Sequence, residues 1–378
     1  MTVKYGPDGT ELWSAHFSPG GFTAADPLAI AVDAAGNSVI AGGVSTPGFG
    51  YDYLVVKYDP LGRELWSTRY DGPGALDEEG EGDDDIARDL VLDRDGGVYV
   101  TGDSDGGPSG QDFATVKLAP DGTVLWATRF DGPASGGDVA RSIALDGRDG
   151  SLYVAGDSTA PMTFQDIVTV KYDRDGRQVW SRRFTGNGLF HHDAAVAVRL
   201  DGTGGVYVSG YAFRRGSGGD YVTLKYDRDG NGVALAAYGG PSGERNGFDE
   251  PKAMVVDAGG SVYVTGRSTG LSGGLEYATV KYVPAPVVDF RRGDSNADGG
   301  VDLADAMFTL GWLFTGGPRP DCLKSADTDD TGDVQITDPI FLLGHLFLGG
   351  APPQPPVGGC GRETSLDFLS CERFAACR

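Results

Sequence analysis

Cysteine is absent from the first 321 residues of this 378-residue sequence. An even number of cysteines in a short C-terminal segment predicts disulfides and an oxidising compartment, and it leaves the three possible pairings open. A zinc site is disfavoured, because the spacings include no pair of C-x-x-C motifs and no nearby pair of histidines. The four cysteines are Cys322, Cys360, Cys371 and Cys377.

Long hydrophobic runs and basic residues are also scarce. No stretch of about 18 or more apolar residues is present, so no segment is predicted to span a membrane. The 31 Lys and Arg residues face 54 Asp and Glu residues, which gives a net charge of −23. A chain this acidic repels phosphate backbones and anionic lipid surfaces, which argues against nucleic-acid binding.

The amino terminus, MTVKYGPDG, lacks the apolar segment of a signal peptide and begins in the middle of a repeat. We therefore expect that the start is truncated or misassigned, so the missing signal does not argue against secretion. The localisation expected from the cysteines is extracellular or at the cell surface.

Glycine, in contrast, is abundant, with 62 residues in the chain. This is more than twice the usual share of about 7%, and no G-X-Y period indicates collagen. Apolar residues make up 40% and aromatic residues 10%, which suffices for a hydrophobic core and argues against wholesale disorder. Many glycines together with valine, tyrosine and threonine favour short strands joined by tight turns.

A repeat with a period of 53 to 60 residues fills the first 284 residues. Strings such as TVKY, VVKY and TLKY place a lysine at positions 4, 57, 117, 171, 225 and 281. Each full unit reads as four short strands of alternating polarity, which predicts one antiparallel sheet per unit. The second strand carries a string of the V-Y-V-T-G type, and the fourth usually carries a tryptophan: Trp13, Trp66, Trp126 and Trp180.

Such a sheet has two apolar faces and cannot bury either face alone, so neighbouring sheets must stack. The sequence therefore predicts an all-β fold, a β-propeller of five or six four-stranded blades in residues 1–284. The N-terminus supplies only third and fourth strands (2–5 and 11–17), and the far end of the region supplies only the first three. We expect the N-terminal fourth strand to complete the last blade and close the ring. A larger ring cut off at its N-terminus is the alternative.

The units resemble the SBBP family of bacterial β-propeller repeats, whose units read like GNVYVTG…DYATVKYD..G..LW. The resemblance covers residues 1–284. It implies the propeller fold and no particular chemistry.

Acidic residues recur at three positions of each unit, before the first strand, after it, and at the start of the third strand. A residue that every blade carries is expected to be structural, bonding turn backbone or pairing with the recurrent lysine. The turns DRDGG (93–97), DRDG (173–176) and DRDGNG (227–232) resemble the start of calcium loops. They lack the later ligands, so we expect tight turns.

Long loops are predicted on one face of the propeller, and residues that do not repeat gather there. Binding residues commonly lie on such loops, so we expect this face to bind a glycan or protein ligand. The acidic run could bind Ca²⁺ or be a solvated loop. The two histidines could bind a metal, act as a general base, or be incidental. The segments are 76–85, His191-His192, Arg214-Arg215 and Glu244-Arg245-Asn246.

After Pro284 the composition changes, and residues 285–292 are expected to form a linker. Residues 294–317 and 327–350 then align at an offset of 33. Each opens with oxygen-bearing residues at loop positions 1, 3, 5, 9 and 12, a position 7 that offers its carbonyl, and glycine at position 6, as in a calcium loop. Apolar helices should follow, at Leu303–Phe314 and Ile336–Leu348, each ending at two glycines. The predicted ligands are Asp294, Asn296, Asp298, Gly300, Asp302 and Asp305, and then Asp327, Asp329, Thr331, Asp333, Gln335 and Asp338.

The duplicated loop and helix, with Asp at position 12 and Val301 and Val334 at position 8, resembles a dockerin. The resemblance defines a module at 293–350, with the cysteine-containing tail 351–378 packed on it through disulfides. It implies two Ca²⁺ sites, pairing of the two loops, and a protein partner that is either cohesin-like or a cell-surface component.

Together these features predict a monomeric, secreted or surface-associated binding or scaffold protein. No GxSxG, HExxH or GxGxxG motif occurs in a suitable context, and no catalytic residue is assigned. The alternative is a carbohydrate-active hydrolase or lyase with two carboxylates ~5–10 Å apart. Its dockerin-like module would deliver it to a polysaccharide.

Overall fold

A computed structural model describes residues 1–18, 24–45, 50–74, 84–134, 136–161, 163–186, 192–213, 218–241, 247–282, 288–362, 366–367, 369, 371 and 373–377. Two compact units divide the chain. The first unit consists of Met1–Thr223, Arg228–Gly230 and Tyr238–Tyr282. The second consists of Leu224–Asp227, Asn231–Ala237 and Val283–Arg378.

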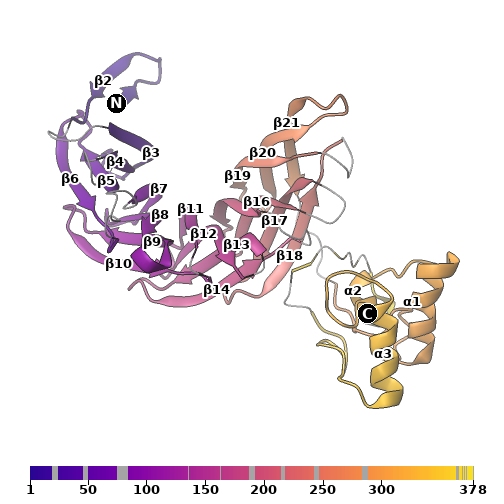
Figure 1. Ribbon diagram of the computed structural model, residues 1–378. Helices are drawn as coiled ribbons and strands as arrows, with labels where there is room; N and C mark the ends of the chain where they lie inside the picture. Colours follow the sequence, from indigo (N-terminus) through magenta and orange to yellow (C-terminus); the bar gives the residue numbers. More distant parts are fainter. Residues whose placement is uncertain are drawn as a thin grey trace. The chain divides into compact units, whose positions relative to one another are not determined.

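Antiparallel sheets account for nearly all regular structure in residues 1–282, as predicted (Figure 1). Four sheets have four strands each, in simple chain order. Tight turns such as 33–37 and 59–63 join the first strand to the second and the third to the fourth. These strands are β3(Ala24–Val32), β4(Ser38–Ser45), β5(Tyr51–Tyr58), β6(Glu64–Tyr70), β7(Ile86–Leu92), β8(Val98–Asp105), β9(Gln111–Leu118), β10(Val124–Phe130), β11(Asp138–Leu145), β12(Leu152–Ala160), β13(Thr163–Tyr172), β14(Gln178–Phe184), β15(Ala194–Leu200), β16(Val206–Phe213), β17(Gly219–Tyr226) and β18(Gly232–Tyr238).

Two incomplete sheets precede and follow these four. The first pairs β1(Thr2–Tyr5) with β2(Glu11–Ala15), and the last contains β19(Glu250–Val256), β20(Val262–Thr269) and β21(Leu275–Tyr282). The expectation that the N-terminal fourth strand completes the last blade is wrong, because β2 pairs with β1 and the last sheet has three strands. Trp13 on β2 packs instead on Tyr58 of the next sheet and donates from Nε1 to the carbonyl of Pro60 at 3.0 Å.

The hydrophobic core lies between successive sheets. Val39 and Val55 of one sheet pack with Val98 and Val116 of the next, and all four are almost fully buried. First strands contact first strands along the series, β3 with β7, β7 with β11, β11 with β15, and β15 with β19. Face-to-face packing with neighbouring first strands is the arrangement of propeller blades.

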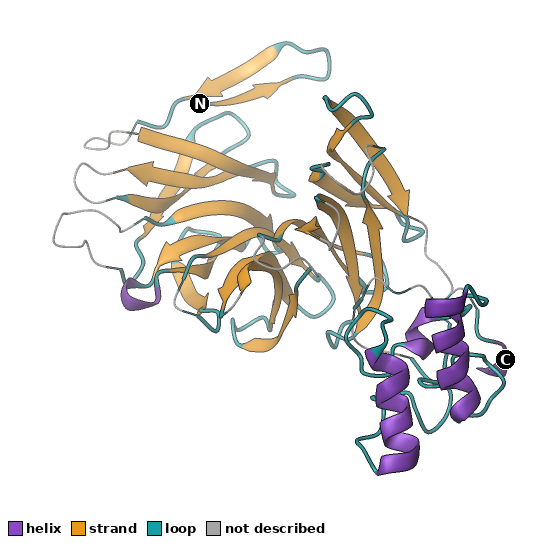
Figure 2. Cartoon of the chain, turned by 45° about the vertical axis from the view of Figure 1, so that its right-hand side comes forward, coloured by secondary structure: helices purple, strands orange, loops and turns teal. Residues whose placement is uncertain are grey.

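The second unit contains α1(Leu303–Thr315), α2(Leu323–Ala326) and α3(Thr337–Leu348) (Figure 2). α1 and α3 agree with the predicted helices and end at Gly316 and Gly349, both left-handed. The two helices contact each other. Short 3₁₀ turns occur at Gly107–Ser109 and Ala375–Cys377. Among the described residues no helix has the length and apolar character needed to cross a membrane.

Candidate functional sites

The two predicted calcium loops adopt the same local conformation at the offset of 33. In the first loop, the Asp294 carboxylate accepts from the backbone N–H groups of Asp298 and Gly299, at 3.0 and 2.9 Å. Asp302 caps helix α1, and Asp305 accepts from its backbone N–H at 2.9 Å. Asp294 and Asp305 are fully buried, and burial raises the pKa of both, that of Asp305 to about 6.

The second loop repeats this geometry and gathers its carboxylates more closely. Asp327 accepts from the backbone N–H groups of Thr331 and Gly332, each at 3.0 Å. One oxygen from each of Asp327, Asp329 and Asp338 lies within 4.8 Å of the other two. Burial raises the pKa of Asp327 to about 7 and that of Asp338 to about 6, and each carboxylate also feels a neighbouring one. A divalent cation bound among these oxygens would remove that repulsion.

The remaining predicted ligands line the same loops. Asn296 donates to Asp298 at 2.9 Å, and Thr331 donates to Asp329 at 2.8 Å. In the first loop, no three acidic oxygens of described residues form an equally tight group. Asp302 supplies a helix cap, and Gly300 donates to Asp298 at 2.8 Å. Asp333 offers its carbonyl 3.4 Å from the Thr331 hydroxyl, and the backbone N–H of Gln335 donates to Asp338 at 2.7 Å.

Among the described residues, no bridge joins the two loops through Val301 and Val334, contrary to the expectation. The isolated bridges of the described residues join Phe290 to Gly361 and Cys322 to Cys371. The segments ahead of the loops are joined instead. Gly293 donates to the carbonyl of Ser325 at 2.8 Å, and Arg292 donates to the carbonyl of Asp327.

Arg292 is fully buried beneath the second loop. Its guanidinium lies 4.0 Å from the carboxylate of Asp327 and 2.9 Å from that of Asp330, which has a positive φ of 58°. One positive charge therefore sits under a loop that carries several carboxylates. It balances only part of their charge.

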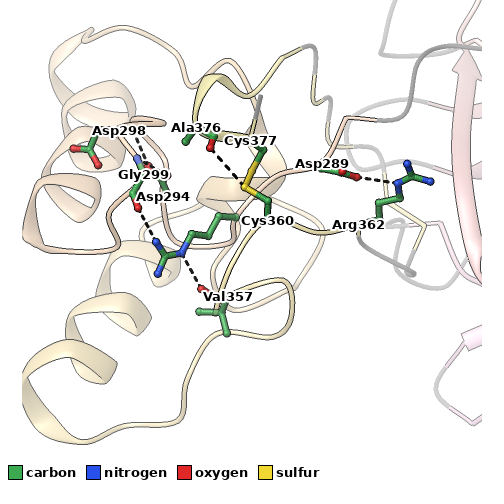
Figure 3. The surroundings of a disulfide bond; sticks show 10 residues. Asp289, Asp294, Asp298, Gly299, Val357, Cys360, Arg362, Ala376 and Cys377 are labelled. Carbon is green, nitrogen blue, oxygen red and sulfur yellow. Dashed lines mark hydrogen bonds and ion pairs between the residues drawn. A yellow bond between two sulfur atoms is a disulfide. The ribbon is translucent and has the colours of Figure 1, made fainter.

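The disulfides pair as Cys322–Cys371 and Cys360–Cys377. The first joins the tail to the helical module, as expected, and the second closes a loop within the tail itself. Figure 3 shows the second bridge beside Asp294, Asp298 and Gly299 of the first loop. Arg291 links the tail to this loop by donating to the carbonyls of Val357 and Gly299, at 2.9 and 2.7 Å. The tail thus lies against the loop that is predicted to bind metal.

A second candidate site lies on the first strands of the sheets. In each of β3, β7, β11, β15 and β19 the pairing register skips one residue near the start of the strand. Such a β-bulge redirects the side chain of the extra residue and often lies beside a functional site. The extra residues are Leu28, Arg88, Arg141, Val196 and Lys252.

The bulge explains the glycine that recurs in the second strand of each of these sheets. A Cβ built on Gly156 would lie 2.0 Å from the carbonyl oxygen of Val139, and one on Gly102 would lie 1.9 Å from that of Ile86. The bulged backbone comes so close that no side chain fits. The same close approach occurs at Gly42, Gly210 and Gly266.

The residue after this glycine completes the site. Arg88 donates from Nε and Nη2 to both carboxylate oxygens of Asp103, and Arg141 does the same to Asp157; the Nη2 distances are 3.0 and 3.2 Å. The aspartates are 1% and 0% exposed, whereas the arginines are 32% and 38% exposed. Each of these partly exposed arginine side chains is thus anchored by a buried carboxylate.

Neighbouring pairs interact from sheet to sheet. Burial raises the pKa of Asp157, Arg141 and Arg88 oppose this rise, and Asp103 adds to it. On the next sheet the equivalent residue is Tyr211, whose pKa is raised by burial and by Asp157. These side chains therefore form one connected group.

The sequence did not predict this group of interacting side chains, although one variable position in the repeat indicates it. The position after the glycine varies from unit to unit, while the strand around it repeats. A position that varies inside a repeated strand, and is polar in four of the five sheets, indicates a role that the scaffold itself does not need. The residues there are Gly43, Asp103, Asp157, Tyr211 and Arg267.

The long loops expected to bind ligand fall largely outside the described residues, including 75–83, His191, Arg214-Arg215 and Glu244–Asn246. His192 is described: its Nδ1 lies 3.2 Å from Gln165 Oε1, and its ring stacks on Phe164 at 4.9 Å.

Two further groups of three carboxylates lie at equivalent junctions between sheets, and each already holds an arginine. Arg69 pairs with Asp52 at 2.6 Å, and Arg129 pairs with Asp112 at 2.9 Å. The groups are Asp52, Asp71 and Asp85, and Asp112, Asp131 and Asp138.

A wide cavity of about 820 Å³ opens at the other end of the first strands. Val32, Leu92 and Leu145 line it together with the turns that follow these strands. In one of these turns Arg148 pairs with Asp146 at 2.8 Å. The bulge residues do not line this cavity.

Comparison with known proteins agrees with the repeat architecture. Residues 66–108 match the family described as "SBBP: Beta-propeller repeat", and this match spans the end of β6, β7 and β8. The fold is a mostly β propeller of repeated antiparallel sheets, followed by a small helical part.

Matches to individual proteins are distant. An uncharacterized WD repeat-containing protein, L264, of Acanthamoeba polyphaga mimivirus is 24% identical over 263 residues, which are 56% of this chain and 18% of that protein. The chain thus spans less than a fifth of that relative.

Two solved structures are also similar. The periplasmic gluconolactonase PpgL of Pseudomonas aeruginosa is 15% identical, with a TM-score of 0.43 over 75% of this chain and 80% of that one. A protein of unknown function from Bacteroides caccae is 18% identical, with a TM-score of 0.37 over 61% and 73%.

Proposed function

We propose that this chain is a secreted or surface-associated, non-catalytic binding protein. Its propeller offers the face with the long loops to a ligand, and its C-terminal dockerin-like unit binds two Ca²⁺ ions and attaches the protein to a partner. A cohesin-like protein or another cell-surface component is the proposed partner.

The observation that carries the proposal is the carboxylate group of Asp327, Asp329 and Asp338. Two of its members are fully buried, and among the described residues Arg292 provides a compensating charge near Asp327. Buried carboxylates that repel one another cost free energy unless a cation joins them. All the donors are oxygens, and carbonyl, carboxylate and amide oxygens are the ligands that suit Ca²⁺. The first loop has the same spacing of oxygen-bearing residues, so we propose that it binds a second Ca²⁺ ion.

Two disulfides support secretion, because such bonds persist in oxidising compartments. The bidentate arginine contacts of Asp103 and Asp157 favour binding over glycoside hydrolysis. A catalytic acid must hold a proton that it can deliver, whereas both oxygens of each of these carboxylates already accept from a guanidinium.

Calcium titration of the full chain by calorimetry tests the metal sites. We expect two ions per chain, and one when Asp327 and Asp338 are both changed to Asn. Asp257→Asn is the matched control, since Asp257 accepts two backbone N–H bonds in a propeller turn. No heat of binding at millimolar Ca²⁺, with no metal found by native mass spectrometry, would refute the metal sites. Pull-down and glycan-array binding, with and without Ca²⁺, then test the partner and the ligand.

A further inference from the structure

The bulge arginines have the geometry of a preorganised anion site. Arg88 and Arg141 occupy the same bulge position on adjacent first strands, β7 and β11, which contact each other. Because the bulge lies near the start of each strand, both arginines lie at the end of the propeller that carries the long loops. This is the face that we propose for ligand binding.

Each guanidinium is held rigidly and is still available. Nε and Nη2 are used by the buried aspartate, and Nη1 has no hydrogen-bond partner among the described residues. About a third of each arginine side chain is exposed. An arginine fixed through one edge loses little rotamer entropy when its other donors bind an anion.

The surroundings add charge and an aromatic surface. Arg267 and Lys252 share the carboxylate of Glu250, with Arg267 Nη2 at 2.5 Å. Arg267 also lies over the ring of Phe248, 5.4 Å from its centre, and Tyr211 packs edge-on against that ring at 5.5 Å. Arg88, Arg141, Lys252 and Arg267 each pair with a carboxylate of Asp103, Asp157 or Glu250, in a chain of net charge −23.

We propose that Arg88, Arg141 and Tyr211, flanked by Arg267, bind the carboxylate of an acidic sugar, of the kind that a uronate residue presents. This inference rests on the proposed binding role of the propeller and names its ligand class. Guanidinium groups bind carboxylates through charge-assisted hydrogen bonds, and an aromatic surface beside them suits the apolar face of a sugar ring.

Calorimetric titration of the full chain with D-glucuronate and short uronate oligomers tests this assignment. Arg88→Lys and Arg141→Lys keep the charge opposite each aspartate and remove the forked donor set. Each should weaken glucuronate binding about tenfold or more, since a hydrogen bond to a charged group contributes strongly. Arg183→Lys is the matched control. Arg183 also pairs with a buried aspartate, Asp166, but it lies on β14, outside the proposed site. That variant should bind as the wild type does.

Titrations with glucose, acetate and phosphate test separately whether the sugar ring, the carboxylate or any anion is recognised. Weak or absent binding of all three, beside measurable binding of glucuronate, supports it. Equal binding of phosphate or acetate, weakened by the same variants, overturns the sugar assignment. If no uronate binds at about 10 mM, the proposed sugar site is wrong. If the same sample still binds Ca²⁺, the metal sites of the proposed function are unaffected by that result. Unfolding temperatures of the variants confirm that each one folds.

Discussion

Single aspartates hold the propeller turns together. Asp193, ahead of the fourth complete sheet, accepts from the backbone N–H groups of Gly186 and Phe213, at 2.6 and 2.8 Å. It thereby joins the connection between two sheets to the end of a second strand. Asp138 makes the equivalent bonds, and Asp33 accepts two N–H bonds in its turn and pairs with Lys57 at 3.1 Å. The recurrent acids are thus structural, as their presence in every unit predicted.

Asp193 should make the stability of the propeller depend on pH. Burial raises its pKa from 3.8 to about 6, against the two backbone N–H bonds. Between these values the folded chain keeps a proton that the unfolded chain has released. The group therefore stabilises the fold fully below about pH 4, and this contribution is lost as the pH rises through about 6. At about 1.4 kcal/mol per pKa unit, the loss is about 3 kcal/mol.

Urea unfolding of the wild type and Asp193→Asn, from pH 4 to 7, measures this effect through tryptophan fluorescence. The free energy of unfolding of the wild type, relative to the variant, should fall by about 3 kcal/mol over that range. Parallel profiles for the two proteins would show that Asp193 titrates normally in the folded state.

At the scale of the strand, the bulge and its glycine act together. Ala in place of Gly156 would put a methyl group 2.0 Å from a backbone oxygen, so the two strands must separate. We expect Gly156→Ala to lower the free energy of unfolding by about 3 kcal/mol or more, the upper range for overpacking. Chemical denaturation measures it. Gly202→Ala is the control, since a Cβ there meets no atom within 4 Å. A similar small effect of both changes would contradict this explanation of the glycine.

The strands themselves could be predicted from alternating polarity, and the turns from aspartate and glycine. The bulges could not, because a bulge is a property of the register between two strands, and the sequence pattern reports each strand separately. The repeated glycine was visible, but its cause, the carbonyl of the facing strand, appears only in three dimensions. For the same reason Asp103 and Asp157 were not recognised as partners of Arg88 and Arg141.

At the scale of the whole molecule, the repeat predicted the sheets and their order. It failed for the closure of the ring, because that closure requires pairing between strands from opposite ends of the region. β1 and β2 have a local alternative, the turn at Gly6–Thr10 that joins them as a hairpin. Local contacts cost less loop entropy than distant ones. The disulfide pairing was likewise undetermined, since four cysteines fit three patterns.

The two loops that we propose as calcium sites could be located from spacing alone, because the candidate ligand positions lie along one short loop. The contribution of the tail was not predictable in the same way. Arg291 connects the first loop to Val357, and Asp367 lies beside the turn glycine of the second loop, Gly332. Both loops thus contact a segment that follows them in the chain, and ion binding is expected to stabilise that assembly.

Hydrogen exchange followed by mass spectrometry, on the full chain with excess Ca²⁺ and with EDTA, tests the central claim most directly. We predict that amides in 294–305 and 327–338 exchange at least about tenfold more slowly with Ca²⁺. Amides of the propeller sheet β11–β14 should be unchanged. Equal exchange rates in both loops, with and without Ca²⁺, would contradict the account.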